Sequence, residues 1–355
     1  MSTRRFFSPD YATAQKRFRD AVAAAAGELT SLALPVTGPA REELAIDVAW
    51  FGAAAPRRAL VHTSGVHGVE GYAGSAIQLQ WLADGVPDLP ADAAVALVHF
   101  VNPYGAAWLR RVNENNVDLN RNFGAGGVQS GGAEEYAALD ALLNPRSPPR
   151  GDFFYARAAM LVLRQGMNRL RTAIIGGQTM NPRGLFYAGQ KLEAGPATYQ
   201  NYLAPRLAAA ARIVAVDVHT GFGRYGEDTL MLHAAANRAH LNQRMQEAFG
   251  ARAQLTDGSG DAYHVEGSHE EMYARLVPRA DVHFVTQEFG TLHAVRVLAA
   301  LRAENRWHHH GTGVIEHRSK RRLLSAFCPE DEAWRAKVLS RGREVIGQAC
   351  ALAFE

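Results

Sequence analysis

Short apolar runs alternate with longer stretches of helical periodicity along this chain of 355 residues. The apolar runs are rich in valine, isoleucine and alanine, and most end at polar or glycine-rich residues, which is typical of buried strands. They lie at 31–36, 44–51, 59–63, 94–101, 213–218 and 282–286. Helical spacing marks 8–27, 71–83, 133–143, 157–172 and 198–211. This alternation predicts an α/β fold with a mixed, mainly parallel central sheet and helices on both faces.

Polar side chains follow four of the predicted strands at or near the point where each strand ends. They are His67, Asn102, His219 and Glu288. Open α/β sheets bind ligands at the carboxyl ends of their parallel strands. The four exits therefore predict one active site at this edge of the sheet.

The segment 62–70 reads HTSGVHGVE and places His67 and Glu70 three residues apart. A histidine and a carboxylate at this spacing can face the same metal ion, and catalytic zinc commonly takes three protein ligands. His219 is the best third ligand, because it ends an apolar run and precedes a glycine loop. Asp217 stands two residues earlier, where it can orient the His219 ring. Each residue alone is ordinary loop chemistry, whereas together they predict one zinc ion per chain.

A zinc hydrolase also needs a base for its water, and Glu288 in FVTQEFGT fits that role. The segment 102–123, NPYGAAWLRRVNENNVDLNRNF, contributes Arg110, Arg111 and Arg121. Arginine presents a planar charged fork that suits a carboxylate. Arginines clustered near a metal indicate an anionic substrate, although any one of them alone would be read as part of an exposed basic loop.

The ordered set of HxxE, NPYG, DLNRNF, a distant histidine and a late glutamate resembles the zinc carboxypeptidase (M14) superfamily. HGVEGYAGSAIQ together with the 102–123 segment is most similar to its branch known as the domain of unknown function 2817. These motifs span residues 62–290, most of the chain. The resemblance implies that His67, Glu70 and His219 bind zinc and that Glu288 is the general base.

The resemblance also implies roles around the substrate. Asn120 and Arg121 match the pair that holds a terminal carboxylate. Arg111, or with less support Arg110, matches the arginine that polarises the scissile carbonyl and stabilises the oxyanion. Tyr263 lies at about the place of the tyrosine that closes over the substrate. The specificity-pocket residues of the digestive enzymes are not recognisable in the sequence.

These features predict a hydrolase that cleaves an amide bond next to a free carboxylate, on a small molecule or short peptide. One alternative is an N-acyl-amino-acid deacylase, because the related aspartoacylase and succinylglutamate desuccinylase group shares the same motifs. Another is a non-catalytic protein that binds an acidic ligand. The presence of all three ligands and the base argues against that last alternative.

Composition adds limits rather than a function. Hydrophobic residues make up 47% and charged residues 21%, and the net charge is +3, so nothing indicates a nucleic-acid partner. Two cysteines, Cys328 and Cys350, cannot build a disulfide framework. No segment resembles a signal peptide or a membrane span. We therefore expect a cytoplasmic protein without a membrane partner, and its oligomeric state stays open.

One domain over 1–355 is expected, with an insertion around 124–200 that contains the Pro-rich connector 144–151. The triplet 308–310 consists of three histidines before Gly311. Adjacent side chains cannot all face one ion in a helix or strand. We interpret the triplet as a solvated loop rather than a second metal site.

Overall fold

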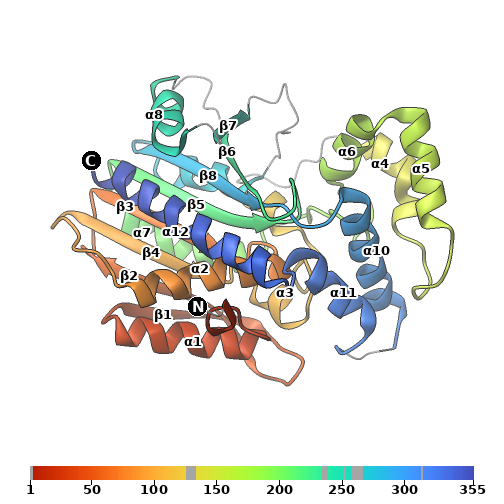
Figure 1. The fold of residues 1–355 in the computed structure, drawn as a ribbon, viewed down its shortest axis with the longest axis horizontal. Helices are drawn as coiled ribbons and strands as arrows, with labels where there is room; N and C mark the ends of the chain where they lie inside the picture. Colours follow the sequence, from red (N-terminus) through yellow and green to blue (C-terminus); the bar gives the residue numbers. More distant parts are fainter. Residues whose placement is uncertain (1–2, 125–132, 234–238, 251–252, 257–266, 313–314) are drawn as a thin grey trace.

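The computed structural model describes residues 3–124, 133–233, 239–250, 253–256, 267–312 and 315–355 (Figure 1). Within these ranges, eight strands form one sheet in the order β1-β2-β4-β3-β5-β8-β6-β7. The strands are β1 (Glu28–Thr37), β2 (Glu43–Gly52), β3 (Arg58–Ser64), β4 (Ala93–His99), β5 (Arg212–Thr220), β6 (Asp228–His233), β7 (Ala253–Thr256) and β8 (Asp281–Phe289).

The four strands at the centre of the sheet are parallel. β4 pairs with β3, β3 with β5, and β5 with β8, all in the same direction. On one side of these four strands, β1 pairs with β2 and β2 with β4, both antiparallel. On the other side, β6 pairs antiparallel with β8 and parallel with β7. The predicted mixed, mainly parallel sheet is thus confirmed. The six predicted strands all form, and β6 and β7 were not predicted.

Alternate side chains of β5 enter two different cores, because successive residues of a strand point to opposite faces. Val214, Val216 and Val218 pack beneath α1 (Tyr11–Ala24), α2 (Gly71–Asp84) and α12 (Glu332–Phe354). Ile213 and Ala215 pack beneath α7 (Ala194–Leu207) and α9 (His269–Leu276). Helices therefore cover both faces, as predicted.

A second group of helices lies beside one end of the sheet (Figure 1). It consists of α4 (Ala133–Leu143), α5 (Phe154–Gln165), α6 (Met167–Ile175), α10 (Ala294–His310) and α11 (Arg318–Phe327). α6 packs against both α4 and α5, and α10 packs against α5 and α11. α4 to α6 occupy much of the segment expected as an insertion, whereas α7 at its end covers the sheet.

The helix predicted over 157–172 is wrong as a single element. α5 ends at Gln165 and α6 begins at Met167, with Gly166 between them at φ 80°. Glycine adopts this conformation without the penalty that a side chain would bring, so the chain turns there. Shorter elements complete the fold: η1 (Thr3–Arg5), η2 (Gly68–Glu70), α3 (Pro103–Ala107), η3 (Leu119–Arg121) and α8 (Ala239–Phe249).

None of the helices in the described ranges combines the length and apolar character that crossing a membrane requires.

Candidate metal centre

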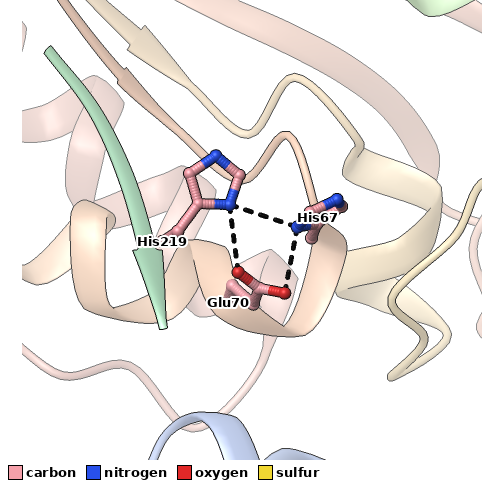
Figure 2. Close-up of side chains that lie close together, drawn as sticks. All are labelled: His67, Glu70 and His219. Atoms are coloured by element: carbon pink, nitrogen blue, oxygen red, sulfur yellow. Dashed lines mark hydrogen bonds and ion pairs between the residues drawn. The ribbon is translucent and has the colours of Figure 1, made fainter. Parts of the chain in front are cut away.

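His67, Glu70 and His219 converge on one point (Figure 2). His67 directly precedes η2, Glu70 ends it, and His219 lies near the end of β5. The His67 and His219 Nδ1 atoms are 3.1 Å apart. Glu70 places Oε1 3.0 Å from His67 Nδ1 and Oε2 3.1 Å from His219 Nδ1. The segment folds this tightly because Gly68 packs against Gly105, where a Cβ would lie 2.1 Å from the backbone.

The donor set fits zinc. Two imidazole nitrogens and a carboxylate oxygen are ligands that catalytic zinc uses. With metal–ligand bonds of about 2.0–2.1 Å, a tetrahedral ion spaces its ligands roughly 3.3 Å apart, close to the separations seen here. The three side chains are 4%, 2% and 3% exposed, so they do not form a solvated acidic cluster. In the described ranges they are the single group of this kind.

A carboxylate holds the far side of each histidine ring. Asp118 Oδ1 lies 2.8 Å from His67 Nε2, and Asp217 Oδ2 lies 2.9 Å from His219 Nε2. A proton held on Nε2 by these contacts leaves Nδ1 with its lone pair toward the centre, as a metal ligand requires. The predicted orienting contact of Asp217 is present. Asp217 also bonds His269 Nδ1 at 2.9 Å, which ties the centre to α9.

The electrostatics of the cluster favour a cation. Burial alone would lower the pKa of His219, but Asp217 and Glu70 raise it well above its ordinary value. Burial alone would raise the pKa of Glu70, but His67 and His219 lower it. The excess negative charge that holds protons here in the absence of metal would equally attract a divalent ion.

Glu288 is the neighbour of His219 across the β5–β8 ladder, so both side chains extend to the same face of the sheet. It is 8% exposed, and its Oε1 accepts a hydrogen bond of 3.0 Å from the backbone N–H of Phe222. Burial raises the pKa of Glu288 to about 8, with Glu70 adding to the rise and His219 opposing it. The result is a carboxylate beside the cluster with a pKa near neutrality.

Asp118 connects the metal centre to both arginines of the site. It is fully buried before η3, and its carboxylate pairs with Arg111 and Arg121 as well as with His67. These cations hold the pKa of Asp118 well below its usual range, against the effect of burial. Both guanidinium groups also stack over the Phe186 ring, at 5.1 and 5.3 Å. Sequence reasoning assigned no role to Asp118, although it stands first in DLNRNF.

The structure brings most of the predicted residues to one cavity of about 420 Å³. Its lining includes His67, Glu70, His219, Glu288, Arg111, Asn120 and Arg121. Asn120 is partly buried, and its Oδ1 accepts a hydrogen bond of 3.2 Å from the backbone N–H of His269. Within the described part of the chain, this contact leaves its amide nitrogen as the end that can meet a ligand. The roles of these residues stay predictions.

Arg110 does not join them. Its fully buried guanidinium bonds Glu304 at 3.0 Å, Asn116 at 2.8 Å and Asn305 at 3.2 Å, and it does not line the cavity. Burial among these partners argues against the expected substrate contact of Arg110, and of the neighbouring pair only Arg111 lines the cavity. Tyr263 lies outside the described residues.

The three histidines at 308–310 form the last turn of α10, so the expected loop is wrong. His308 and His309 are partly buried, and burial lowers the pKa of His308 to about 3 and that of His309 to about 4. His309 Nε2 lies 3.2 Å from Asn116 Oδ1. The triplet therefore packs against the loop that follows α3.

Residues 7–341 match the model of a protein family of unknown function, DUF2817. A search of curated proteins finds no match. Bovine thrombin-activatable fibrinolysis inhibitor, solved in complex with tick carboxypeptidase inhibitor, superposes with a TM-score of 0.51 at 12% identity, covering 95% of this chain and 98% of that one. Murein-tripeptide amidase MpaA from Escherichia coli O157 gives 0.40 at 18% identity, covering 82% and 96%. A succinylglutamate desuccinylase from Silicibacter sp. TM1040 gives 0.39 at 16%, covering 79% and 64%. At such identities the likeness shows the fold alone.

Proposed function

We propose that this chain, which belongs to the DUF2817 family of proteins of unknown function, is a zinc-dependent hydrolase that cleaves an amide bond next to a free carboxylate. The observation that carries the proposal is the buried His67–Glu70–His219 cluster with Glu288 beside it. The same cavity presents Asn120 and Arg121, which suit a carboxylate. The substrate is a small molecule or short peptide with that carboxylate.

His67, Glu70 and His219 would hold the zinc ion, with Asp118 and Asp217 fixing the two rings. Zinc bound there would supply Lewis acidity, polarising the substrate carbonyl and making a water molecule nucleophilic at neutral pH. Everything else in the reaction falls to side chains of this chain.

Glu288 takes a proton from the attacking water and gives it to the leaving amine nitrogen. A general acid–base group works best when its pKa lies near the working pH. Burial raises the pKa of Glu288 to about 8, and a zinc ion bound beside it would lower that pKa again, toward the range in which the carboxylate can accept and then donate a proton. The backbone N–H of Phe222 donates to Oε1 of Glu288 and fixes that oxygen, so Oε2 is the oxygen that would carry the proton.

Arg111 supplies positive charge where the carbonyl oxygen becomes negative. Its Nε lies 3.4 Å from Glu70 Oε1, so the guanidinium stands beside the proposed ligands. Asp118 and Phe186 hold it in that position before any substrate arrives. Arg121, held by the same Asp118, shares the substrate carboxylate with Asn120.

A second candidate is an N-acyl-amino-acid deacylase, which needs the same residues and differs in the acyl half of its substrate. The observation that favours it is the apolar wall of the cavity, because α4, α5, α6 and α10 contribute mainly leucine, isoleucine, valine and phenylalanine side chains. Such a wall suits a hydrocarbon group better than a peptide.

Glu288→Gln tests the proposal. We expect turnover to fall by roughly 10²–10⁴, while metal analysis of the purified variant still finds about one zinc per chain. Blocked dipeptides and N-acyl amino acids serve as substrates, with a chelator control. Glu270→Gln, at another carboxylate that lines the cavity, is the matched control and should retain turnover within a few-fold. Unchanged activity in Glu288→Gln would refute the mechanism. A zinc-loaded wild type that cleaves no amide would favour the binding protein.

A further inference from the structure

The cavity has a polar end and an apolar remainder. Beyond the metal centre its walls come mainly from four helices of the group beside the sheet, α4, α5, α6 and α10. Side chains that line this part include Leu142, Phe154, Leu161, Leu170, Ile174 and Leu298. Several of them also belong to the small apolar clusters that hold the helices together. We call this part the apolar chamber.

Four of the charged residues that line the cavity, Glu70, Arg111, Arg121 and Glu288, belong to its polar end. The others are Glu270, in the first turn of α9, and Arg171 of α6. Arg171 stacks over the Phe222 ring at 5.5 Å, and the backbone N–H of Phe222 bonds Glu288, so this cation lies on the side of the chamber nearest the catalytic residues. His293 is exposed at the start of α10, where its ring accepts from the Val295 N–H. A ligand that extends from the centre into the chamber thus meets mainly hydrocarbon.

Resting on the proposed function, we infer that the substrates are amino acids N-acylated with a long saturated chain, and that the apolar chamber holds this chain. A peptide would carry an N–H and a C=O per residue into a wall that, among the described residues, offers few polar groups to bond them, at a cost that a hydrocarbon does not meet. An indole or phenol side chain would leave its polar end unpaired in the same way.

The size of the cavity sets the chain length. The cavity as a whole, its polar end included, has a volume of about 420 Å³. A methylene occupies about 30 Å³, as a water molecule does in the liquid, so once the amino-acid part of the substrate is seated the chamber has room for at most on the order of ten methylenes. That exceeds a leucine side chain by more than twofold. Acyl chains of about eight to twelve carbons would fill the chamber.

The reaction is a simple hydrolysis. The oxygen of water bonds to the acyl carbon, the bond from that carbon to nitrogen breaks, and Glu288 passes the proton of the water to the departing nitrogen. The products are a fatty acid and a free amino acid, and nothing is oxidised or reduced.

The first test measures kcat/KM for one amino acid carrying acyl groups from two to about fourteen carbons. Each buried methylene should raise kcat/KM about fourfold until the chamber is full, after which the profile should flatten or fall. A flat profile overturns the inference and leaves the proposed function intact. Preference for an apolar C-terminal residue over a long acyl group also overturns it.

Two neighbouring alanines of α5 provide a matched pair of variants. Ala158 is 9% exposed and lines the chamber, whereas Ala159 is exposed. Ala158→Trp should cut kcat/KM for a dodecanoyl substrate at least tenfold while an acetyl substrate changes less than twofold. Ala159→Trp should match the wild type on both. Where Ala158→Trp lowers the Tm strongly, Ala158→Leu replaces it and should shorten the preferred chain by a few carbons.

Binding of dodecanoate to chelator-treated protein separates this inference from the proposed function. Titration calorimetry should find one site that Ala158→Trp weakens at least tenfold and Ala159→Trp leaves unchanged. Equal affinity in all three proteins overturns the chamber as the acyl site. If dodecanoate binds as expected but no acyl amino acid is cleaved at any length, the proposed function fails and the substrate assignment with it.

Discussion

Asp118→Asn is the most informative single substitution, because one buried carboxylate supports the metal centre and both arginines. Asp118 contacts His67 Nε2 at 2.8 Å, pairs with Arg111 and Arg121, and accepts from the backbone N–H of Asn120 at 3.2 Å. Asparagine keeps the volume and one oxygen but removes the negative charge. It also turns an NH₂ donor toward groups that are themselves donors.

Two losses of different size follow. Removing one partner of a buried ion pair costs roughly 3–5 kcal/mol, because the remaining charge stays buried without compensation. Losing the hydrogen bond that orients a ligating histidine typically costs 10–100-fold in metal affinity, or about 1.4–2.8 kcal/mol. Urea unfolding of the metal-free protein measures the first loss. Competition with a chromophoric zinc chelator measures the second on folded protein.

Asp152→Asn is the matched control. Asp152 also bridges two arginines, Arg302 and Arg306, but it touches none of the proposed ligands. It should lower stability less, since its side chain is 22% exposed, and it should leave zinc affinity unchanged. If Asp118→Asn binds zinc as tightly as Asp152→Asn does, the orientation of His67 by Asp118 has no energetic weight and our account of the centre is wrong.

Two further predictions concern other parts of the structure. Asn120→Ala should lower kcat/KM by roughly 10- to 150-fold for a substrate with a free carboxylate and hardly at all for its carboxamide, because a hydrogen bond to a charged group contributes roughly 1.5–3 kcal/mol. An equal loss for both substrates would contradict the carboxylate role. Arg110 and Lys320 lower the pKa of Glu304 to about 2 against the effect of burial, so Glu304 should stabilise the fold by about 3 kcal/mol above its unfolded pKa and lose this as pH falls through 2. Urea unfolding of wild type and Glu304→Gln should differ most at pH 7, roughly half as much at pH 3 and little below pH 2, and a difference independent of pH would refute it.

The sheet was predictable because each central strand is buried on both faces and therefore reads as a continuous apolar run. β3, β5 and β8 contain such runs, and all three form at the expected places. β6 and β7 were missed because they are short, at 6 and 4 residues, and β7 forms the edge of the sheet, where an apolar run is not required. The break at Gly166 was missed because the apolar periodicity continues through it.

The resemblance to DUF2817 is confirmed by the family match, and the fold is shared with bovine thrombin-activatable fibrinolysis inhibitor. The convergence of His67, Glu70 and His219 could be predicted from the sequence, because it depends on a local motif and on the end of a strand. The choice between Arg110 and Arg111 did not, because it depends on Glu304 of α10, which lies 194 residues from Arg110 and binds it. The side chains of adjacent residues point in different directions. The position of Glu304 therefore decides that Arg110 is buried away from the cavity and that Arg111 lines it.

The apolar chamber could not be predicted from the sequence either, because it too depends on contacts between distant segments. Its leucines and phenylalanines look like the core of any helical segment, since apolar periodicity states that a face is covered but not by what. The faces of α4, α5 and α6 meet one another and α10, yet together they leave a cavity that opens on the metal centre. The candidate metal ligands at the strand ends could therefore be predicted from the sequence. The shape of the cavity that would select the substrate could not, because it depends on how four helices pack.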